Sequence, residues 1–129
     1  MKNKILLIHH LPFIGGATKS LLQLSEKLNS SGYNVTVLFF LENGEAYKIF
    51  EDNNIKCISF SKGRVFQHAY GAYIPLFSIK FYRVFLAFFR ALYSIIPSLI
   101  ILKKLKPDIV YLNTSLLFPF AIASRILSI

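Results

Sequence analysis

The stretch KILLIHHLPFIGGATKSLLQLSEKLNSSG, residues 4–32, decides which fold this chain is expected to adopt. Its apolar run at residues 5–8 is the pattern of a strand that is buried on both faces of a parallel sheet. A loop at residues 11–17 follows, and Thr18 is then expected to cap a leucine-rich helix that ends at Gly32. Strand, glycine-containing turn and helix in this order are typical of α/β folds.

The loop carries the adjacent glycines Gly15 and Gly16 directly before the expected helix. In doubly wound α/β folds such a loop opens at the carboxyl edge of the sheet, where backbone N–H groups and the positive end of the helix dipole can receive a phosphate. The pair matches neither the dinucleotide fingerprint G-x-G-x-x-G nor the P-loop, because Thr18 precedes Lys19 where the P-loop requires glycine. A phosphate-binding loop and a merely tight turn both remain open.

The rest of the chain continues the alternation of strand and helix. Apolar runs predict strands at residues 35–41, 55–60 and 109–112, and helical patterns predict helices at residues 45–52 and 118–129. Right-handed crossovers between these elements imply a Rossmann-like parallel sheet of about four strands with flanking helices.

Details within these elements carry further expectations. Pro107 should force Lys106 out of helical geometry just before the last strand. The single cysteine, Cys57, lies in an apolar run, so we expect an inert thiol. The residues expected to point inward from the third strand are Ile55, Cys57 and Ile58, and those at helical spacing in the last helix are Ile122, Ile126 and Ile129.

Composition limits the possible partners. At 129 residues the chain forms one domain at most, and a hydrophobic content of 54% with a mean hydropathy of +0.51 predicts apolar surface that meets lipid or another domain. Fifteen Lys and Arg against six Asp and Glu give a net charge of +9, which favours anionic partners. Nucleic acid is not expected among them, since no nucleic-acid motif is present and the basic residues lie among apolar ones.

Residues 61–106 form a basic aromatic segment that contains no acidic residue. Phe and Tyr rings can settle at the acyl boundary of a membrane while Lys and Arg reach anionic headgroups. The residues expected to bind the membrane are Arg64, Lys80, Arg83, Arg90, Lys103 and Lys104.

Three interpretations compete for residues 77–105 within this segment. They can form a crossover helix packed on the sheet, followed by a second helix that begins near Pro97. They can also form a helix on the membrane surface. A transmembrane span is disfavoured because Arg90 and Pro97 fall inside it, and a central Arg costs about 2.5–3.5 kcal/mol on insertion scales.

Two segments resemble the N-terminal domain of family 4 glycosyltransferases, which have the GT-B fold. Residues 4–38, with GGA before a leucine-rich helix, are similar to the opening of that domain, and KPDIVYLNT at residues 106–114 is similar to its fourth strand and following loop. The resemblance implies that residues 1–129 are a truncated family 4-like N-terminal domain. It also implies transfer of a sugar from a nucleotide sugar to a glycan or lipid-linked acceptor, with retention of configuration and without a cofactor or an obligatory metal.

The resemblance also assigns candidate site residues. Gly15 and Gly16 would contribute to the loop that binds the diphosphate, and Asn113 and Thr114 would bind acceptor hydroxyls, although both can instead cap the final helix. Many family members have a histidine near position 113. This chain has Asn113 there, so the proton-relay role of that histidine does not transfer to it. We identify no catalytic residue and no Ser-His-Asp or Cys-His arrangement.

Three other polar residues, His9, His10 and Lys19, lie near the loop. His9 and His10 follow the first strand without a cluster of further metal ligands in sequence, so we expect a structural or loop-orienting role. Lys19 can meet a phosphate or remain solvated.

The E-x7-E pair of the family's C-terminal domain is missing, and with it the half that binds most of the nucleotide sugar. We therefore expect the isolated chain to be inactive and to need a C-terminal glycosyltransferase domain as partner. The apolar run near the N-terminus is too short for a signal peptide, so a cytoplasmic protein on the inner face of the membrane is expected. The alternative is a non-catalytic, membrane-associated binding or assembly protein.

Overall fold

The computed structural model describes residues 3–40, 44–61 and 82–129. Its elements, in chain order, are β1 (Lys4–His9), α1 (Gly16–Ser30), β2 (Asn34–Phe39), α2 (Glu45–Asp52), β3 (Lys56–Ser59), α3 (Tyr82–Tyr93), α4 (Ile95–Leu105), β4 (Ile109–Leu112), the 3-10 helix η3 (Ser115–Leu117) and α5 (Phe118–Ile126). These elements confirm the alternation of strand and helix that the apolar runs predicted.

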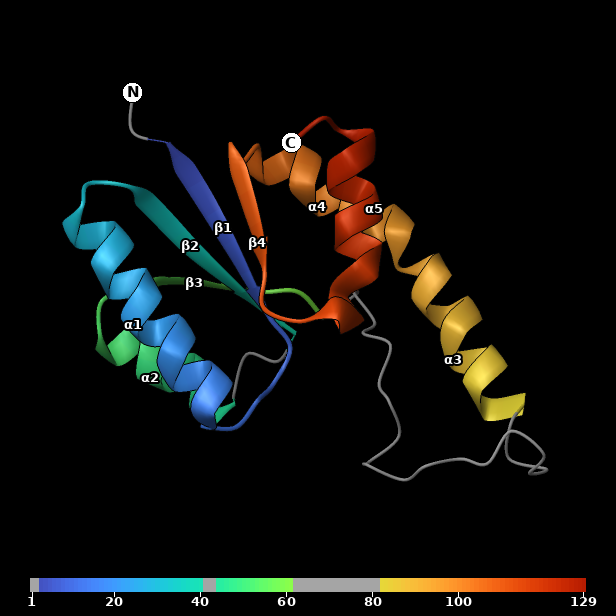
Figure 1. The fold of residues 1–129 in the computed structure, drawn as a ribbon, viewed down its shortest axis with the longest axis horizontal. Coiled ribbons are helices and arrows are strands. Elements are labelled where there is room, and N and C mark those ends of the chain that lie inside the picture. The colour runs from blue at the N-terminus through green and yellow to red at the C-terminus, as the bar shows by residue number, and fades with distance from the viewer. Residues whose placement is uncertain (1–2, 41–43, 62–81) are drawn as a thin grey trace.

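The strands form one four-stranded sheet in the order β3-β2-β1-β4, and every pairing is parallel (Figure 1). Ile5 pairs with Val35 on one side and with Ile109 on the other, so β1 lies inside the sheet. Strand β1 is buried from Ile5 to His9, which its continuous apolar run predicted. The Rossmann-like α/β fold is therefore confirmed.

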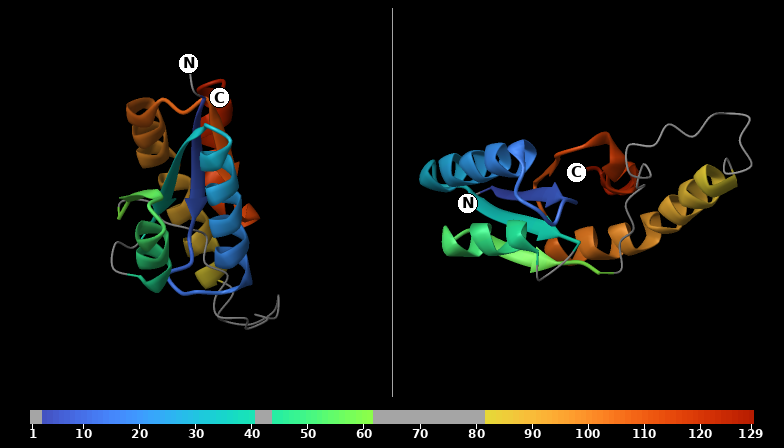
Figure 2. Two further views of the ribbon diagram at one scale, coloured as in Figure 1. Left: turned by 90° about the vertical axis from the view of Figure 1, so that its left-hand side faces the viewer. Right: turned by 90° about the horizontal axis from the view of Figure 1, so that it is seen from below.

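Helices cover the two faces of the sheet and form two separate cores. Ile5, Leu7 and Val37 point to the face covered by α1 and α2, while Leu6 and Ile8 point to the face covered by α4 and α5. Figure 2 shows α1 and α4 on opposite sides of the sheet. This two-sided cover explains why β1 reads as an uninterrupted apolar run, because each successive side chain enters one core or the other.

The start of α1 differs from the sequence-based expectation. Helix α1 begins at Gly16 with Gly15 as its N-cap, and Thr18 is buried inside the first turn. The expected capping role of Thr18 is wrong, because its hydroxyl donates to the Phe13 carbonyl oxygen in the preceding loop instead of accepting from the helix backbone. Leu21 enters the core and its neighbouring leucines pack around it, as the helical spacing predicted.

Two left-handed residues close helices where the sequence indicated an end. Gly32 has a φ of 89°, and its N–H donates to the Asn29 carbonyl oxygen while the Tyr33 N–H donates to that of Leu28, which is a Schellman closure. Lys106 has a φ of 46°, so Pro107 does end α4 as expected. Both endings return the chain to the sheet at the amino ends of β2 and β4.

The segment at residues 77–105 contains two helices within the part that is described. Helix α4 contains Pro97 in its first turn and packs Leu102 against the sheet core, which confirms a second helix near Pro97. Helix α3 extends away from the sheet beyond α4 (Figure 1). Among the described helices, none is both long enough and apolar enough to cross a membrane.

The last helix is shorter than expected and turns a different side inward. Helix α5 ends at Ile126, and its buried side carries Phe120 and Ala123. Ile122, Ile126 and Ile129, which share the predicted helical spacing, are exposed. Their spacing therefore marked a face of the helix without marking which face is buried.

The loop after β1 also contacts the start of α2. The Ala46 N–H donates to the Pro12 carbonyl oxygen at 3.0 Å, and Gly44 caps α2 beside the same carbonyl. A Cβ atom at position 44 would lie 2.7 Å from that oxygen, so the close approach requires glycine.

We therefore predict that Gly44→Ala lowers the free energy of unfolding by about 1–3 kcal/mol, because the methyl group and the Pro12 carbonyl cannot occupy the same space. Urea denaturation followed by circular dichroism measures this loss. Gly16→Ala is the matched control, since nothing lies within 4 Å of a Cβ atom at position 16. Equal unfolding midpoints for the two variants would contradict the prediction.

Candidate functional site

The carboxyl ends of β1 and β4 bring together residues that are far apart in sequence. His9 ends β1, and Asn113 directly follows β4. The side-chain Nδ2 of Asn113 lies 3.0 Å from Nδ1 of His9. Asn113 and the glycine loop therefore share one edge of the sheet, as the sequence predicted for a parallel arrangement.

The same histidine connects this edge to helix α1. Nε2 of His9 lies 3.0 Å from the hydroxyl oxygen of Thr18, and that hydroxyl donates to the Phe13 carbonyl oxygen, also at 3.0 Å. We call Asn113, His9, Thr18 and the Phe13 carbonyl the edge network. It joins the β4 loop, the end of β1, the first turn of α1 and the loop between them.

Burial determines the protonation of His9. Its side chain is 0% exposed and meets the ring of Phe39 edge-on at a centroid distance of 5.8 Å. Burial, followed by repulsion from His10, lowers the pKa of His9 to about 4. His9 is therefore neutral near pH 7, which supports the structural role expected for it.

His10 faces the same edge with an unused nitrogen. Its ring lies 6.1 Å from that of His9, and its buried Nδ1 has no hydrogen-bond partner among the described residues. Burial also lowers the pKa of His10. Both imidazoles are thus held toward the neutral form beside the glycine loop.

The two glycines of the loop are not required by the fold itself. Gly15 has extended backbone geometry, and neither it nor Gly16 has a positive φ. A Cβ atom would meet only the Phe13 ring at 3.9 Å from position 15 and nothing within 4 Å from position 16. The conformation of the turn therefore requires glycine at neither position.

The other predicted residues near this edge have separate surroundings. Lys19 is exposed in the first turn of α1, one residue after buried Thr18. The hydroxyl oxygen of Thr114 accepts from the Leu116 N–H at 3.3 Å and so caps η3, the short helix before α5, whereas the alternative expected from the sequence was a cap of the final helix itself. The other amide atom of Asn113, Oδ1, has no hydrogen-bond partner among the described residues and is not fully buried.

The predicted membrane-binding residues are only partly described. Arg64 and Lys80 lie outside the described residues, and Arg83 belongs to α3. Arg90, Lys103 and Lys104 are exposed. Six exposed side chains of α3 and α4 are spaced alternately four and three residues apart in the sequence, and we call them the apolar stripe: Tyr82, Leu86, Phe89, Tyr93, Ile96 and Ile100.

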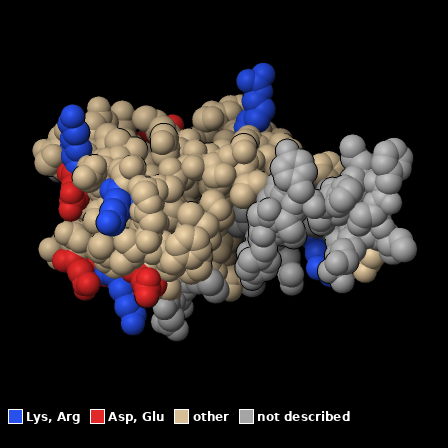
Figure 3. All heavy atoms as spheres, turned by 60° about the horizontal axis from the view of Figure 1, so that its bottom comes forward, with Lys and Arg blue, Asp and Glu red and all other residues tan. Residues whose placement is uncertain are grey.

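The described surface around the carboxyl edge carries few charges. Figure 3 turns this edge forward, and most of the described surface seen there is uncharged. Among the described residues, no group of His, Cys, Asp and Glu is arranged to hold a metal ion.

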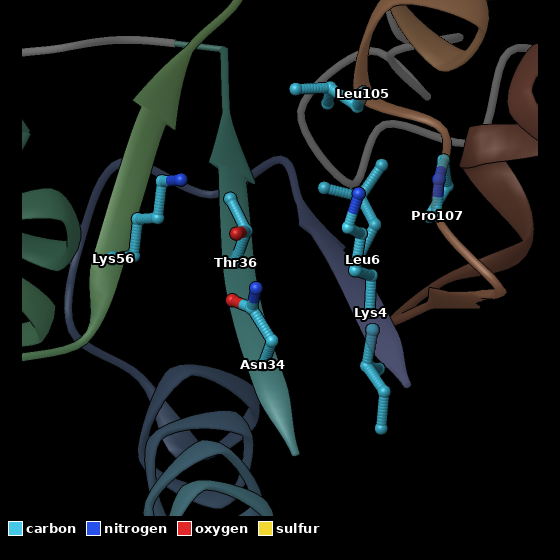
Figure 4. A pocket seen from close by; sticks show the side chains of 8 residues that line it. Lys4, Leu6, Asn34, Thr36, Lys56, Leu105 and Pro107 are labelled. Carbon is cyan, nitrogen blue, oxygen red and sulfur yellow. The ribbon is translucent and has the colours of Figure 1, made fainter. Parts of the chain in front are cut away.

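A hollow of about 130 Å³ lies at the opposite, amino edge of the sheet (Figure 4). Leu6 and Leu105 line it together with Thr36 of β2, and none of the predicted site residues belongs to it. Ligands of open α/β sheets bind outside the carboxyl ends of the strands, so we place the candidate site at the edge network instead.

Sequence reasoning found the members of this site but missed their connection. His9 and Asn113 follow paired strands, and the pairing of Ile8 with Leu112 places them side by side. That register is a long-range property, so only the shared position at strand ends signalled it. The contact of Thr18 with His9 had no local signal, since a threonine before a helix ordinarily indicates an N-cap.

The four-stranded parallel sheet with helices on both faces is a Rossmann-like α/β fold. A solved structure similar to this chain is the crystal structure of MurG from Acinetobacter baumannii, with a TM-score of 0.64 and 21% sequence identity. The match covers 98% of this chain and 33% of the MurG chain, so the chain spans about one third of that protein's length. No protein-family model and no curated protein sequence matches the chain.

The lowered pKa of His9 predicts a pH-dependent stability. Because the unfolded histidine titrates near 6.5 and the folded one near 4, the unfolded state binds the extra proton as the pH falls. The contribution of neutral His9 to stability is present above the unfolded pKa of 6.5. We expect the free energy of unfolding to fall by about 2 kcal/mol between pH 7 and pH 5. Urea denaturation at several pH values measures this slope.

His9→Gln is the matched variant for this measurement, because its amide can bond to Asn113 and Thr18 without titrating. The carboxylates of the chain titrate equally in both proteins. A slope between pH 7 and pH 5 that is identical in the two proteins would refute the assignment to His9.

Proposed function

We propose that this chain is the N-terminal part of a glycosyltransferase that transfers a sugar from a nucleotide sugar to a glycan or lipid-linked acceptor in cell-surface glycan or glycolipid synthesis. The observation that carries the proposal is that the N-terminus of α1 and Asn113 lie at the same carboxyl edge of a parallel sheet whose fold resembles that of MurG. In this proposal, residues 1–129 are the acceptor-side domain and the nucleotide sugar is a substrate, with no cofactor.

The start of α1 supports binding of the diphosphate. The first N–H groups of a helix have no partner within the helix, and the helix dipole adds positive potential there. Gly15 is half-buried and Gly16 is exposed, so a phosphate can approach these amides without striking a side chain. Exposed Lys19 adds a positive charge on the same turn.

The chemical contribution of this domain is electrostatic. A departing nucleoside diphosphate accumulates negative charge on its oxygens as the bond to the sugar breaks. Fixed N–H dipoles of Gly15, Gly16 and the following residues stabilise that charge without reorganising. The neutral imidazole of His9 is bonded on both sides, so we assign it no proton transfer.

The edge of the sheet supports the need for further polypeptide. Strand β4 is one of the two edge strands of the described sheet, and Ile109 and Tyr111 are 47% and 43% exposed on it. Edge strands are often protected by charge, proline or cover, and β4 has no charged residue or proline between Ile109 and Leu112. We propose that the remainder of a GT-B enzyme, including its C-terminal domain, covers this side, and that the chain is inactive without it.

The apolar stripe supports the proposal that residues 61–106 contain a membrane-facing segment. Six exposed apolar or aromatic side chains share its spacing, and Lys103 and Lys104 end it. No acidic residue lies between Asp52 and Asp108 to oppose an anionic surface. A location on the inner face of the membrane, in the cytoplasm, follows from this proposal.

Membership of family 4 and retention of configuration come from the sequence resemblance alone. The matched structure, MurG, supports the fold shared by GT-B enzymes. Product stereochemistry, read by nuclear magnetic resonance once activity is measured, tests the retaining mechanism directly.

We predict that the chain alone releases no nucleoside diphosphate from UDP-glucose, UDP-N-acetylglucosamine or GDP-mannose, and that mixing with a separately expressed C-terminal GT-B domain restores release. Gly16→Ala should lower the restored rate at least about tenfold, because the methyl group meets the diphosphate. The same variant should unfold with unchanged or up to about 1 kcal/mol greater stability. Coupled detection of nucleoside diphosphate and urea denaturation measure the two effects.

Gly32→Ala is the matched control, because residue 32 has a positive φ and lies beyond the opposite end of α1. It should lose stability and keep its rate per folded molecule. Absence of activity with every C-terminal domain tried would favour the non-catalytic membrane-associated protein instead.

For the membrane, we predict that the chain floats with vesicles of phosphatidylcholine and phosphatidylglycerol and stays in the dense fractions with phosphatidylcholine alone. Ile96→Ser with Ile100→Ser should lower binding at least about tenfold, and each of Lys103→Gln and Lys104→Gln about fivefold. Ile126→Ser is the matched control, since Ile126 is 59% exposed on α5, outside the stripe. Equal effects of the stripe and control variants would count against the proposed membrane face.

A further inference from the structure

The hydrogen bond between Thr18 and the Phe13 carbonyl fixes which atoms donate and which accept in the rest of the edge network. The Phe13 carbonyl oxygen can only accept, so the single hydroxyl proton of Thr18 points to it. The Thr18 oxygen must then accept from His9, which places the imidazole proton on Nε2. Nδ1 is left as an acceptor, and the group of Asn113 beside it must be the donating Nδ2.

We propose that His9 is a positioning residue, locked as the neutral Nε2–H tautomer, that turns the Asn113 carboxamide so that Oδ1 faces the ligand at the carboxyl edge. This inference rests on the proposed function of the edge as an acceptor site. It adds the class of ligand group that Asn113 takes: a hydroxyl or N–H donor.

This orientation separates two kinds of recognition on one edge. The amides of the α1 N-terminus and Lys19 offer only hydrogen-bond donors and positive charge, which suit phosphate oxygens. The Oδ1 atom of Asn113 offers only an acceptor, which repels phosphate oxygens and suits a sugar hydroxyl. A carboxamide rotated by half a turn would present Nδ2 instead and lose this distinction.

Burial keeps the arrangement in place. His9 has no exposed surface, and Thr18 is 1% exposed, so water cannot replace the hydrogen bond between them without opening the start of α1. The lowered pKa of His9 agrees with a neutral ring, and the hydrogen-bond geometry selects which neutral tautomer is present. Local backbone geometry does not hold Asn113, since its side chain bonds across the sheet and not to its own loop.

The test is long-range ¹H–¹⁵N correlation spectroscopy of the histidine rings in the full 129-residue chain at pH 7. We expect His9 to show the single Nε2–H pattern. Thr18→Val keeps the shape of the side chain and removes the hydroxyl, so the pattern should become a mixture of tautomers, while Thr18→Ser should restore it. Asn113→Asp supplies an acceptor where a donor stood, and should move the proton to Nδ1 or protonate the ring fully.

Thr36→Val is the matched control, because it makes the same change on β2 beside the hollow at the amino edge and should leave the His9 pattern unchanged. A His9 signal from the Nδ1–H tautomer or the imidazolium at pH 7 would overturn the proposal. A pattern unaffected by Thr18→Val would overturn it as well. Neither reading requires activity, so a failed lock and a failed transferase assignment are distinguished.

If a C-terminal domain restores activity, the positioning of Asn113 by His9 can also be tested by steady-state kinetics. Thr18→Val should raise KM for the acceptor about five- to tenfold and leave KM for the nucleotide sugar within about twofold, because only Asn113 loses its orientation. Thr18→Ser should return the acceptor KM to the wild-type value. An equal rise in both KM values would show general damage to the edge and contradict a specific positioning role.

Discussion

The interior position of β1 in a parallel sheet is the constraint on which the rest of this structure depends. Its side chains alternate between two cores, so helices must cover both faces. Because all pairings in the sheet are parallel, the carboxyl ends of all four strands lie at the same edge. The last buried residue of β1, His9, therefore lies where the loops to α1 and η3 begin, and its polar ring needs partners from both.

That requirement ties the loops at the carboxyl edge to the end of β1. A buried imidazole without hydrogen bonds costs the free energy of an unsatisfied polar group, about 1–3 kcal/mol. Asn113 and Thr18 meet this need from opposite sides, and Phe13 completes the chain of bonds. The same bonds hold the start of α1 against the sheet, so the demand of one buried side chain fixes the geometry of the candidate site.

The sequence predicted the fold well because its signals were local. Ile5 to Ile8 marked a strand buried on both faces, Gly32 marked a helix end, and Pro107 marked the start of the last unit. The prediction that Thr18 caps α1 was wrong because the capping preference of threonine is a local rule, and its hydrogen bond to buried His9 overrode that preference. Asn113 was placed on the correct edge, yet its bond to His9 depends on strand register, which no short window of sequence contains.

The two cores do not account for all of the apolar residues, and several of the others are exposed. Two parts of this exposed surface have different electrostatic surroundings. The apolar stripe adjoins Lys103 and Lys104 in a stretch without acidic residues, which favours an anionic lipid surface. Ile109 and Tyr111 instead lie on an edge strand that follows Asp108, whose carboxylate accepts from the Lys4 N–H at 2.7 Å. Unpaired strand edges bind other strands, and lipid cannot satisfy their backbone groups, which is why we propose a protein partner for β4 and a membrane surface for the stripe.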